Sequence, residues 1–520
     1  MTQAHSPGSP DDLGIGNSPA APPAAGHLLT LAVMVLLTGS LLTAQFHAMA
    51  ARGPWYDEFY TFYVTSRQFG WPEALSSHWL ADNHPPLFYA LSRATDWLGD
   101  TIEARRRVNL LVEIAAFAIA ALALRHAGRR HLLLAAGFLA FLVAQGPAIV
   151  SAAELRSYFV SFAASALTVL LLTTAWLDRP AEGKRHQAAL VAALLIAFNT
   201  HIATSLICGS MLAMFLVAAL LRRDFPQARA LLWPGFLAGG IFVSITAAQL
   251  PLWEANTRAF WIAPGFGPAR WAIEMAVVRA ITANLLLTAC GALGLMLLAG
   301  ETLLRRRTDR SLEVAVILGA GAATALALAL AIHLMWRPFI IERYLTALLP
   351  VLGMMLSVGC ARVLRLAGRL AGSGAGAALL LAIAALSLVT LADHTRATIA
   401  KTTWAGAATA IAAEAARCPD TAVHIAPARW NADLVALAPA DNAAVVPFAY
   451  RTMAARHGFS IEPASSRRVS ASCPTLFWAE QGRRNVSSAA EILRDVRADG
   501  FAVRKISVRH IGDGWIAAGI

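Results

Sequence analysis

Four ionisable residues lie close together in the sequence, directly after its first long apolar segment. Asp57 and Glu58 are adjacent, and Asp82 and His84 follow in the same stretch, residues 55–89, among many aromatic side chains. Ionisable groups are costly beside a membrane, so a cluster of them there indicates a functional site. A carboxylate in such a site can act as a general base if it lies within hydrogen-bond reach of a hydroxyl.

The first pair begins a predicted helix. Asp57 and Glu58 stand at the start of a helical pattern that runs to Phe69, and aromatic residues recur on one face of it. An amphipathic helix of this kind lies in the plane of the membrane interface, with its apolar face toward the acyl chains. Asp57 is also placed to cap the helix, and the two roles can coexist. The aromatic face consists of Tyr56, Phe59, Tyr60 and Tyr63.

The second pair precedes two prolines. Pro85 and Pro86 restrict the backbone and predict a new helix over 86–98. The turn before this helix would hold the side chains of Asp82 and His84 in a defined place. By itself the motif also fits a structured loop without chemistry.

These residues belong to a membrane protein. The chain of 520 residues is 57% apolar and only 14% charged, with a mean hydropathy of +0.57, whereas soluble chains are about 25% charged. The formal net charge of +12 does not indicate nucleic-acid binding, because the basic residues lie mostly in short loops between apolar segments. Residues 1–26 are rich in Pro, Ala, Gly and Ser and lack Lys and Arg, which predicts a disordered cytoplasmic tail.

Residues 27–392 contain the predicted membrane-spanning helices of a polytopic α-helical protein. About twenty apolar residues are needed to cross a bilayer as a helix. Eleven runs come near this length: 27–48, 108–124, 132–150, 159–177, 187–201, 203–221, 231–251, 277–300, 312–335, 344–361 and 370–392.

Basic residues occupy every second loop between these runs. An excess of Lys and Arg marks the cytoplasmic side. The alternation therefore predicts a multi-pass protein of the cytoplasmic (inner) membrane with its N-terminus inside and its first outer loop, residues 51–107, outside. The basic loops lie near residues 125–130, 184–185, 222–229, 305–310 and 362–369.

The opposite loops carry single polar residues of mixed sign. Polar groups from five separate loops thus share the outer face, and together they predict an outward-facing site. Besides the first outer loop, these groups are Glu154, Arg156, His201, Trp253 with Glu254 and Arg258, and residues 337–344.

Residues 393–520 are predicted to form a small extracytoplasmic α/β domain, because strand-like and helical runs alternate there. Cys418 and Cys473 each precede a Pro and then a predicted strand, so a disulfide is plausible in an oxidising compartment; two unpaired thiols are the alternative. The predicted strands are 422–425, 475–478, 501–508 and 515–518, and the predicted helices are 404–416 and 489–498.

Several motifs in the outer loops resemble those of the GT-C class of polytopic glycosyltransferases, in particular the branch of the protein O-mannosyltransferases and the aminoarabinose (lipid A) transferases. An Asp-Glu pair after the first span and a D-x-H-P-P-L segment, here residues 82–87, are shared. At Phe88 the sequence departs from the mannosyltransferases, which have Gly-Lys after this segment. The further motifs are an Arg before the second span (Arg105, Arg106 or Arg107), E-x-R-x-Y at 154–158, and R-Y…P at 343–350.

This resemblance implies an inverting transfer of a monosaccharide from a polyprenyl-phosphate donor to an acceptor hydroxyl on the outer face of the membrane. The acceptor would be a glycan, a lipid or a protein. The resemblance assigns the base to Asp57, with Glu58 beside it as a second catalytic carboxylate.

The phosphate of the donor requires cations, and an Arg side chain pairs with phosphate through two parallel hydrogen bonds. Arg156 and Arg343 are the first candidates, followed by Arg337 and Arg107. Glu154 is expected to orient Arg156. The alternative for each is an arginine that reaches from the membrane interface into water.

The remaining polar residues of the outer face are expected to bind substrate. The sequence establishes no cofactor. A divalent cation near the phosphate is a candidate, because His84, His201, Glu58 and Asp82 suit a mixed nitrogen and oxygen site, with His84 and Asp82 as its first ligands. For His201 alone, a hydrogen-bonded histidine at a helix end is the alternative. The expected substrate-binding residues are Asp82, His84, Glu154, Tyr158, His201 and Tyr344.

Two other readings of the sequence remain open at this stage. A transporter or flippase for a polyprenyl-linked lipid would have ionisable residues at mid-membrane and repeated halves, whereas the polar residues here gather at one face. A different transferase or phosphatase acting on polyprenyl phosphates would keep the arginines and change the base. Aromatic residues after the seventh run line a groove or form an interfacial belt: Trp253, Phe260, Trp261 and Trp271.

Overall fold

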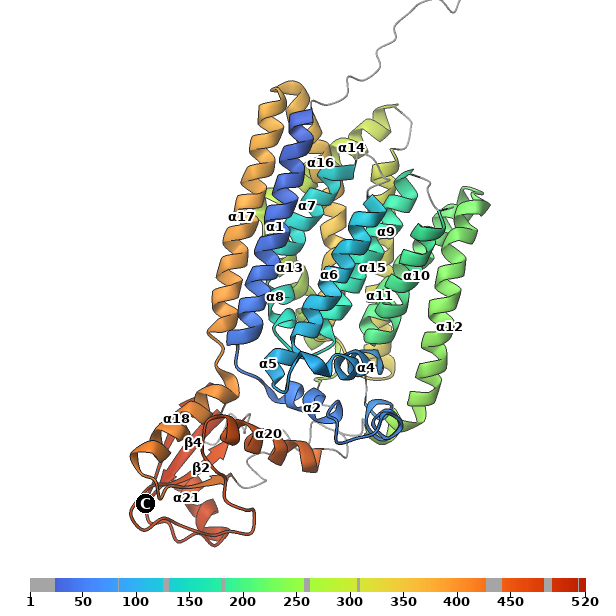
Figure 1. The fold of residues 1–520 in the computed structure, drawn as a ribbon. Coiled ribbons are helices and arrows are strands. Elements are labelled where there is room, and N and C mark those ends of the chain that lie inside the picture. The colour runs from blue at the N-terminus through green and yellow to red at the C-terminus, as the bar shows by residue number, and fades with distance from the viewer. Residues whose placement is uncertain are drawn as a thin grey trace, which may run out of the picture.

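The computed structural model describes a bundle of long helices with a small α/β region at one end (Figure 1). α1 begins at the end of the bundle farthest from the α/β region and runs toward it. The described residues are 24–82, 84–124, 131–178, 183–256, 262–305, 309–426, 442–480, 489–512 and 514–520.

The bundle confirms a polytopic helical membrane protein. Within the described ranges, nine helices are long and apolar enough to cross a membrane, or ten if α7 and α8, bent by 67°, form one span. The predicted run 187–201 is α10, which has 17 residues and packs between α9, α11 and α12. The helices of the bundle are α1 (Ala24–Ala51), α6 (Arg107–Leu124), α7 (Leu132–Val143), α8 (Gly146–Ala152), α9 (Tyr158–Asp178), α10 (Lys184–Thr200), α11 (Ile202–Leu221), α12 (Phe225–Asn256), α13 (Phe266–Thr282), α14 (Leu285–Arg305), α15 (Arg310–Met335), α16 (Leu349–Leu370) and α17 (Ser373–Ile399).

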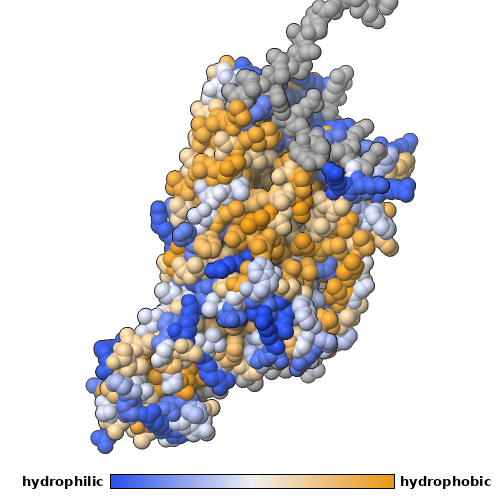
Figure 2. Space-filling view, viewed as in Figure 1, coloured by the Kyte–Doolittle hydropathy of each residue, from blue (hydrophilic) through white to orange (hydrophobic). Residues whose placement is uncertain are grey.

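The burial of each helix depends on whether it faces other helices or the lipid. A helix pairs its own backbone groups, so it can expose apolar side chains to lipid. α9 is buried from Tyr158 to Trp176 and forms the centre of the bundle, whereas outer helices expose large apolar residues such as Val35, Phe236 and Met296. Figure 2 shows hydrophobic side chains over the flank of the bundle and hydrophilic ones where it meets the α/β region.

The first outer loop lies across one end of the bundle, next to the α/β region (Figure 1). The helix predicted to run to Phe69 ends at Val64, and the helix predicted over 86–98 is divided into two short helices. The elements of the loop are α2 (Tyr56–Val64), α3 (Trp71–Glu73), the π-helix η1 (Ala74–Trp79), α4 (Leu87–Ala94), the 3-10 helix η2 (Asp96–Leu98) and α5 (Ile102–Arg105).

The prediction that the aromatic face of α2 contacts acyl chains is wrong. Tyr56 and Phe59 are buried, and the ring of Phe59 lies 5.0 Å from that of Trp404, in the α/β region. The ring of Tyr63 lies 5.2 Å from that of Phe448 in the same region. Phe59 and Tyr63 of the aromatic face are thus part of the interface through which the α/β region packs on α2.

A close backbone contact joins the two parts. Gly53 donates its N–H to the carbonyl of Lys401 at 3.2 Å, and a Cβ on Gly53 would lie 2.0 Å from the carbonyl oxygen of Thr402. The hydroxyl of Thr403 donates to the carbonyl of Pro54 at 2.6 Å. A residue with a side chain at position 53 would therefore separate the first outer loop from the chain that follows α17.

The C-terminal α/β region contains a four-stranded sheet in the order β1-β2-β4-β3, with β1 parallel to β2 and the other pairs antiparallel. All four predicted strands are present, although the third begins at Ile506 rather than at 501. The sequence reading missed α20, whose Pro447 interrupts the helical pattern. The elements are α18 (Thr403–Arg417), β1 (Ala422–Ile425), α20 (Asn442–Arg456), β2 (Thr475–Ala479), α21 (Ala489–Ala498), β3 (Ile506–Ile511) and β4 (Gly514–Gly519).

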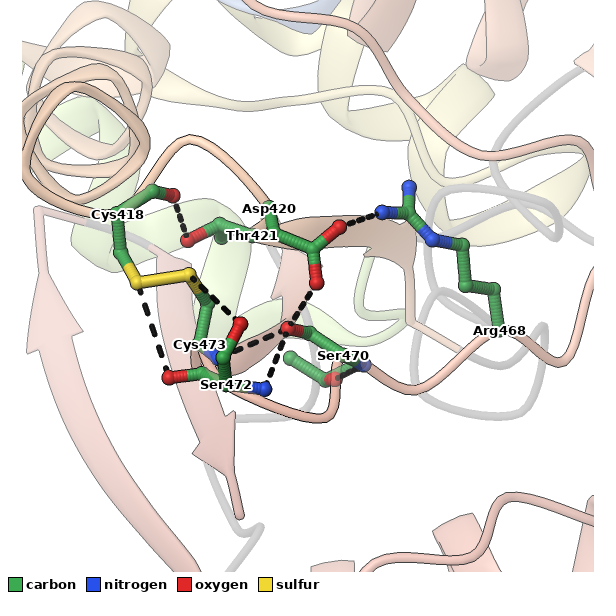
Figure 3. Close-up of a disulfide and its surroundings, with 8 residues drawn as sticks. Cys418, Asp420, Thr421, Arg468, Ser470, Ser472 and Cys473 are labelled. Atoms are coloured by element: carbon green, nitrogen blue, oxygen red, sulfur yellow. Dashed lines mark hydrogen bonds and ion pairs between the residues drawn. A yellow bond between two sulfur atoms is a disulfide. The ribbon is translucent and has the colours of Figure 1, made fainter.

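Of the two alternatives for Cys418 and Cys473, the disulfide is the one present (Figure 3). The parallel register of β1 and β2 places the starts of the two strands side by side, so the Cα atoms of Cys418 and Cys473 are 5.7 Å apart. Beside the disulfide, the hydroxyl of Ser470 donates to Asp420 at 2.7 Å, and Asp420 also pairs with Arg468.

Replacing Cys418 and Cys473 by Ser is expected to lower the free energy of unfolding by about 2–4 kcal/mol, because a cross-link over a long loop restricts the unfolded chain. Thermal unfolding of the detergent-solubilised protein measures this loss. Reductant should produce the same loss in the unchanged protein and no further loss in the double variant. Melting of the unchanged protein that is insensitive to reductant would contradict the pairing.

Candidate active site

Asp57 lies in the first turn of α2, between two arginines from other parts of the chain. Its Oδ2 is 3.6 Å from Nη1 of Arg343 and 4.0 Å from Nη2 of Arg156. Arg156 precedes α9, and Arg343 belongs to the 3-10 helix η4 (Glu342–Leu348). These separations are those of ion pairs without a direct hydrogen bond. The side chain of Asp57 is 22% exposed, so it combines a positive environment with access from outside.

Aromatic rings surround the two arginines. The Cζ of Arg343 lies 5.1 Å from the ring centre of Trp55, 5.4 Å from that of Tyr158 and 5.8 Å from that of Tyr344. A guanidinium at this distance from a ring face is stabilised by the ring quadrupole. The rings therefore keep Arg343 beside Asp57 without neutralising its charge.

Arg156 is fixed by neutral partners. Its Nη1 donates to the hydroxyl of Thr61 at 3.3 Å and to that of Tyr89 at 3.5 Å, and its side chain is only 8% exposed. The carboxylate of Asp57 lies 4.0 Å away without a direct hydrogen bond, so the guanidinium keeps N–H donors that can receive an anion.

The Asp82–His84 turn continues the cluster. Asp82 accepts a hydrogen bond from the hydroxyl of Tyr89 and lies 3.2 Å from Nδ1 of His84. Burial alone would raise the pKa of Asp82, but the charge and the hydrogen bond of His84, together with the charge of Arg156, lower it to about 2. Burial beside Asp82 raises the pKa of Tyr89 well above its ordinary value. Tyr89 thus keeps its proton and donates it to an ionised Asp82.

The two histidines of the cluster are buried. Burial lowers the pKa of His84 and lowers that of His201 well below its ordinary value. The N–H of Ala203 donates to Nδ1 of His201 at 3.1 Å, so the ring proton of His201 is on Nε2. The two imidazole rings are 5.0 Å apart, and that of His201 is 4.4 Å from Tyr344. His201 therefore presents an N–H donor, while Nδ1 of His84 donates to Asp82.

α12 holds this turn by its backbone. Nε2 of Gln249 donates to the backbone carbonyls of Asp82 at 3.2 Å and of His84 at 3.0 Å. The indole N–H of Trp253 donates to the same backbone carbonyl of Asp82 at 2.6 Å. The role of Gln249 was missed, since a single amide within an apolar run gives no periodic signal. Trp253 is a positioning residue rather than part of a belt. Pro85 and Pro86 lack the N–H groups that a helix would offer to the carbonyl of Asp82, so this carbonyl accepts from the side chains of α12 instead.

Glu58 has a different place from Asp57. It is fully buried, and its two oxygens accept from Nε and Nη2 of Arg106 at 2.7 and 2.8 Å. The N–H of Leu155 donates to the same carboxylate at 2.7 Å. The expected catalytic role of Glu58 does not fit this geometry, because protein donors occupy the carboxylate. Glu58 instead joins α2 to α5 and to the loop that carries Arg156.

The prediction that Glu154 orients Arg156 is wrong. Oε1 of Glu154 is 2.7 Å from Nη1 of Arg52, and both side chains are buried. Burial raises the pKa of Glu154, and the charge of Arg52 opposes this rise. Nδ2 of Asn109 also donates to the carbonyl of Glu154 at 2.8 Å. The sequence analysis missed Arg52 as the partner of Glu154. Its place directly after the first span and its opposite charge were the signals that could have indicated this pair.

The other two candidate arginines differ from Arg156 and Arg343. Arg107 is exposed and lies over the ring of Phe46, at 5.8 Å, apart from Asp57; the neighbouring Arg106 is the one that turns inward. Arg337 is half-buried in the segment between α15 and η4, and its proposed contact with phosphate stays a prediction.

Of the four candidate cation ligands, Asp82, His84 and His201 lie near one another, but Glu58 does not join them. Within the described ranges, no group of three or more His, Cys, Asp and Glu side chains is arranged to hold a metal ion, and Glu58 turns away toward Arg106. Among the aromatic candidates, Trp271 on α13 is 59% exposed, as a belt residue would be. Arg258, Phe260 and Trp261, and the side chain of Glu254, lie outside the described residues.

The described bundle, its helical first outer loop and the α/β region define a GT-C fold. In particular, the chain is similar to ArnT from Cupriavidus metallidurans, in crystal structures of the apo state (TM-score 0.53, 14% identity) and of the state bound to undecaprenyl phosphate (TM-score 0.52, 15% identity). Each comparison covers 93% of this chain and 97% of ArnT. No family model and no curated protein sequence matches the chain. The GT-C resemblance found in the outer-loop motifs is thereby confirmed as a likeness of fold.

Proposed function

We propose that the chain is an inverting glycosyltransferase that moves a monosaccharide from a polyprenyl-phosphate donor to an acceptor hydroxyl on the outer face of the cytoplasmic membrane. The observation that carries this proposal is the place of Asp57, partly exposed and 3.6 and 4.0 Å from two arginines. A base beside two cations suits a reaction in which a hydroxyl loses its proton while a phosphate leaves.

In the proposed step, the acceptor oxygen attacks the anomeric carbon as Asp57 takes the hydroxyl proton. The bond between the anomeric carbon and the phosphate oxygen breaks, and the phosphate leaves with both electrons. Attack opposite to the leaving group inverts the anomeric configuration. Asp57 then returns its proton to the solvent that reaches it.

Arg156 and Arg343 would bind the phosphate of the donor. Both present planar guanidinium groups, which pair with phosphate through two hydrogen bonds, and neither has a direct hydrogen bond to Asp57 at the observed distances. The bound state of ArnT contains undecaprenyl phosphate, which supports a lipid of this class as the donor carrier. His201 and Tyr344 would contact the sugar, since neutral N–H and hydroxyl groups suit its hydroxyls.

The outer face is proposed from two independent features. Basic residues alternate along the chain so that the first outer loop lies opposite to the positive side. The disulfide between Cys418 and Cys473 suits an oxidising compartment, and it lies in the region that packs on the first outer loop.

The test uses the purified full chain with polyprenyl-phosphate sugars labelled in the sugar. One of these donors should be consumed, with release of polyprenyl phosphate and formation of a glycoside of opposite anomeric configuration, which nuclear magnetic resonance can assign. The lipid-linked sugar that accumulates in cells without the protein identifies the donor to use first. Movement of an intact donor across vesicles, without release of polyprenyl phosphate, would favour the flippase instead.

Replacing Arg343 by Gln is expected to weaken donor binding by about 10- to 100-fold, because a charged hydrogen bond to phosphate contributes about 1.5–3 kcal/mol. The loss should appear in the KM for the donor. Lys at this position should recover part of it, since the charge remains and the planar fork is lost. Arg270→Gln, in an exposed pair with Glu274, is the matched control. An unchanged KM in the Arg343→Gln variant would exclude Arg343 from the phosphate site.

A further inference from the structure

A cavity of about 150 Å³ lies where α1 and α5 meet α20 of the α/β region. It is separate from the proposed active site. Among the described residues, no hydrogen bond, ion pair or ring contact joins a residue of its lining to Asp57 or to the Asp82–His84 turn. Its lining residues are Phe46, Met49, Ala50, Thr101, Glu103, Ala104, Arg107 and Arg456.

The cavity has an excess of positive charge. Two guanidinium groups, those of Arg107 and Arg456, face one carboxylate, that of Glu103. Arg456 pairs with Glu103 through Nη1, and a guanidinium has five N–H donors, so this pair leaves donors for a second anion. Arg107 has its closest described partner in the ring of Phe46, which supports its charge without cancelling it.

One wall of the cavity belongs to the lipid-facing surface of α1. Phe46 is 46% exposed, and Leu31, Val35 and Leu36 of the same helix are also exposed. Phe46 and Met49 lie in the last two turns of α1, the end that meets the first outer loop. The cavity therefore lies at the border between the apolar flank and the polar end of the bundle.

We propose that this cavity binds the phosphate of an anionic phospholipid of the bilayer. Arg107 would pair with the phosphate bidentately, and Arg456 would supply the second cation. Phe46 and Met49 would contact the glycerol and the first part of an acyl chain. The apolar wall favours a lipid over a free anion, and the net positive charge favours an anionic headgroup over a zwitterionic one. A bound lipid would join α1 and α6 to α20, which packs on α2.

The full chain in detergent tests this proposal by native mass spectrometry and by thermal unfolding. Phosphatidylglycerol should bind saturably and raise the melting temperature, whereas phosphatidylcholine and inorganic phosphate at the same concentration should not. Arg107→Ala should weaken phosphatidylglycerol binding by about tenfold, as expected for one charged hydrogen-bonding partner, and Arg107→Lys by less.

Arg396→Ala is the matched control, because Arg396 is exposed near the same end of the bundle and pairs with Asp393; it should bind phosphatidylglycerol as the unchanged protein does. Arg107→Lys keeps the charge, so it also controls for a folding defect in Arg107→Ala. Equal binding of phosphatidylglycerol by the unchanged protein and both Arg107 variants would overturn the proposal. Binding of inorganic phosphate alone with the same dependence on Arg107 would overturn it in favour of a free-anion site.

Discussion

Replacing Asp57 by Asn is expected to lower the rate of sugar transfer by about 10²- to 10⁴-fold, the usual contribution of a general base. The amide has nearly the same size and cannot accept the proton. Donor binding should be unchanged or tighter, because the variant removes a negative charge 3.6 Å from Arg343 and 4.0 Å from Arg156. Single-turnover rates at saturating donor, together with a binding titration, separate the two effects.

Asp96→Asn is the control for this experiment. Asp96 lies in the same outer loop and pairs with the exposed Arg67, so its loss should leave the transfer rate nearly unchanged. If Asp57→Asn transfers sugar at close to the original rate, Asp57 is not the base. If both binding and transfer are lost, Asp57 is needed for the architecture of the site rather than for proton transfer.

Replacing Glu58 by Gln is expected to lower the free energy of unfolding by about 3–5 kcal/mol, the range for breaking a buried ion pair from one side. Both side chains of the Glu58–Arg106 pair have zero exposure, so the variant leaves the charge of Arg106 uncompensated. Nη1 of Arg106 also donates to the carbonyls of Met49 and Arg52, both at 2.8 Å, which ties the end of the first span to the same pair. Denaturant titration in mixed micelles measures the loss.

The double variant Glu58→Gln and Arg106→Gln should cost less than the sum of the two single variants, because the second change no longer strands a charge. Glu274→Gln removes one partner of an exposed pair on α13 and should leave the stability nearly unchanged. Additive losses, or a loss below about 1 kcal/mol for Glu58→Gln, would show that the pair does not organise the loop.

The sequence by itself determined the helical architecture of the chain and predicted that its polar residues gather at one shared face. Bilayer thickness requires apolar runs of a certain length, so every predicted run is recovered as helix. Three runs are divided between two elements: 132–150 between α7 and α8, 277–300 between α13 and α14, and 344–361 between η4 and α16. The alternation of basic loops placed Asp57, Arg156 and Arg343 on one face, and the structure brings these three together. The sequence also indicated that Cys418 and Cys473 could pair, since each precedes a predicted strand, but it left two unpaired thiols as the alternative.

Only the tertiary structure decided which partner each of these residues takes. Periodicity shows that one face of α2 is aromatic but not that Trp404, far along the chain, covers it. A charge pattern cannot assign Glu154 to Arg52 rather than to Arg156, because both arginines are near in sequence or space. Among consecutive arginines, the turn of the helix between neighbours sends Arg106 inward to Glu58 and Arg107 outward. The partner of each residue depends on contacts between segments that are distant in the sequence. Neither local secondary-structure propensity nor the length of an apolar run contains information about these contacts.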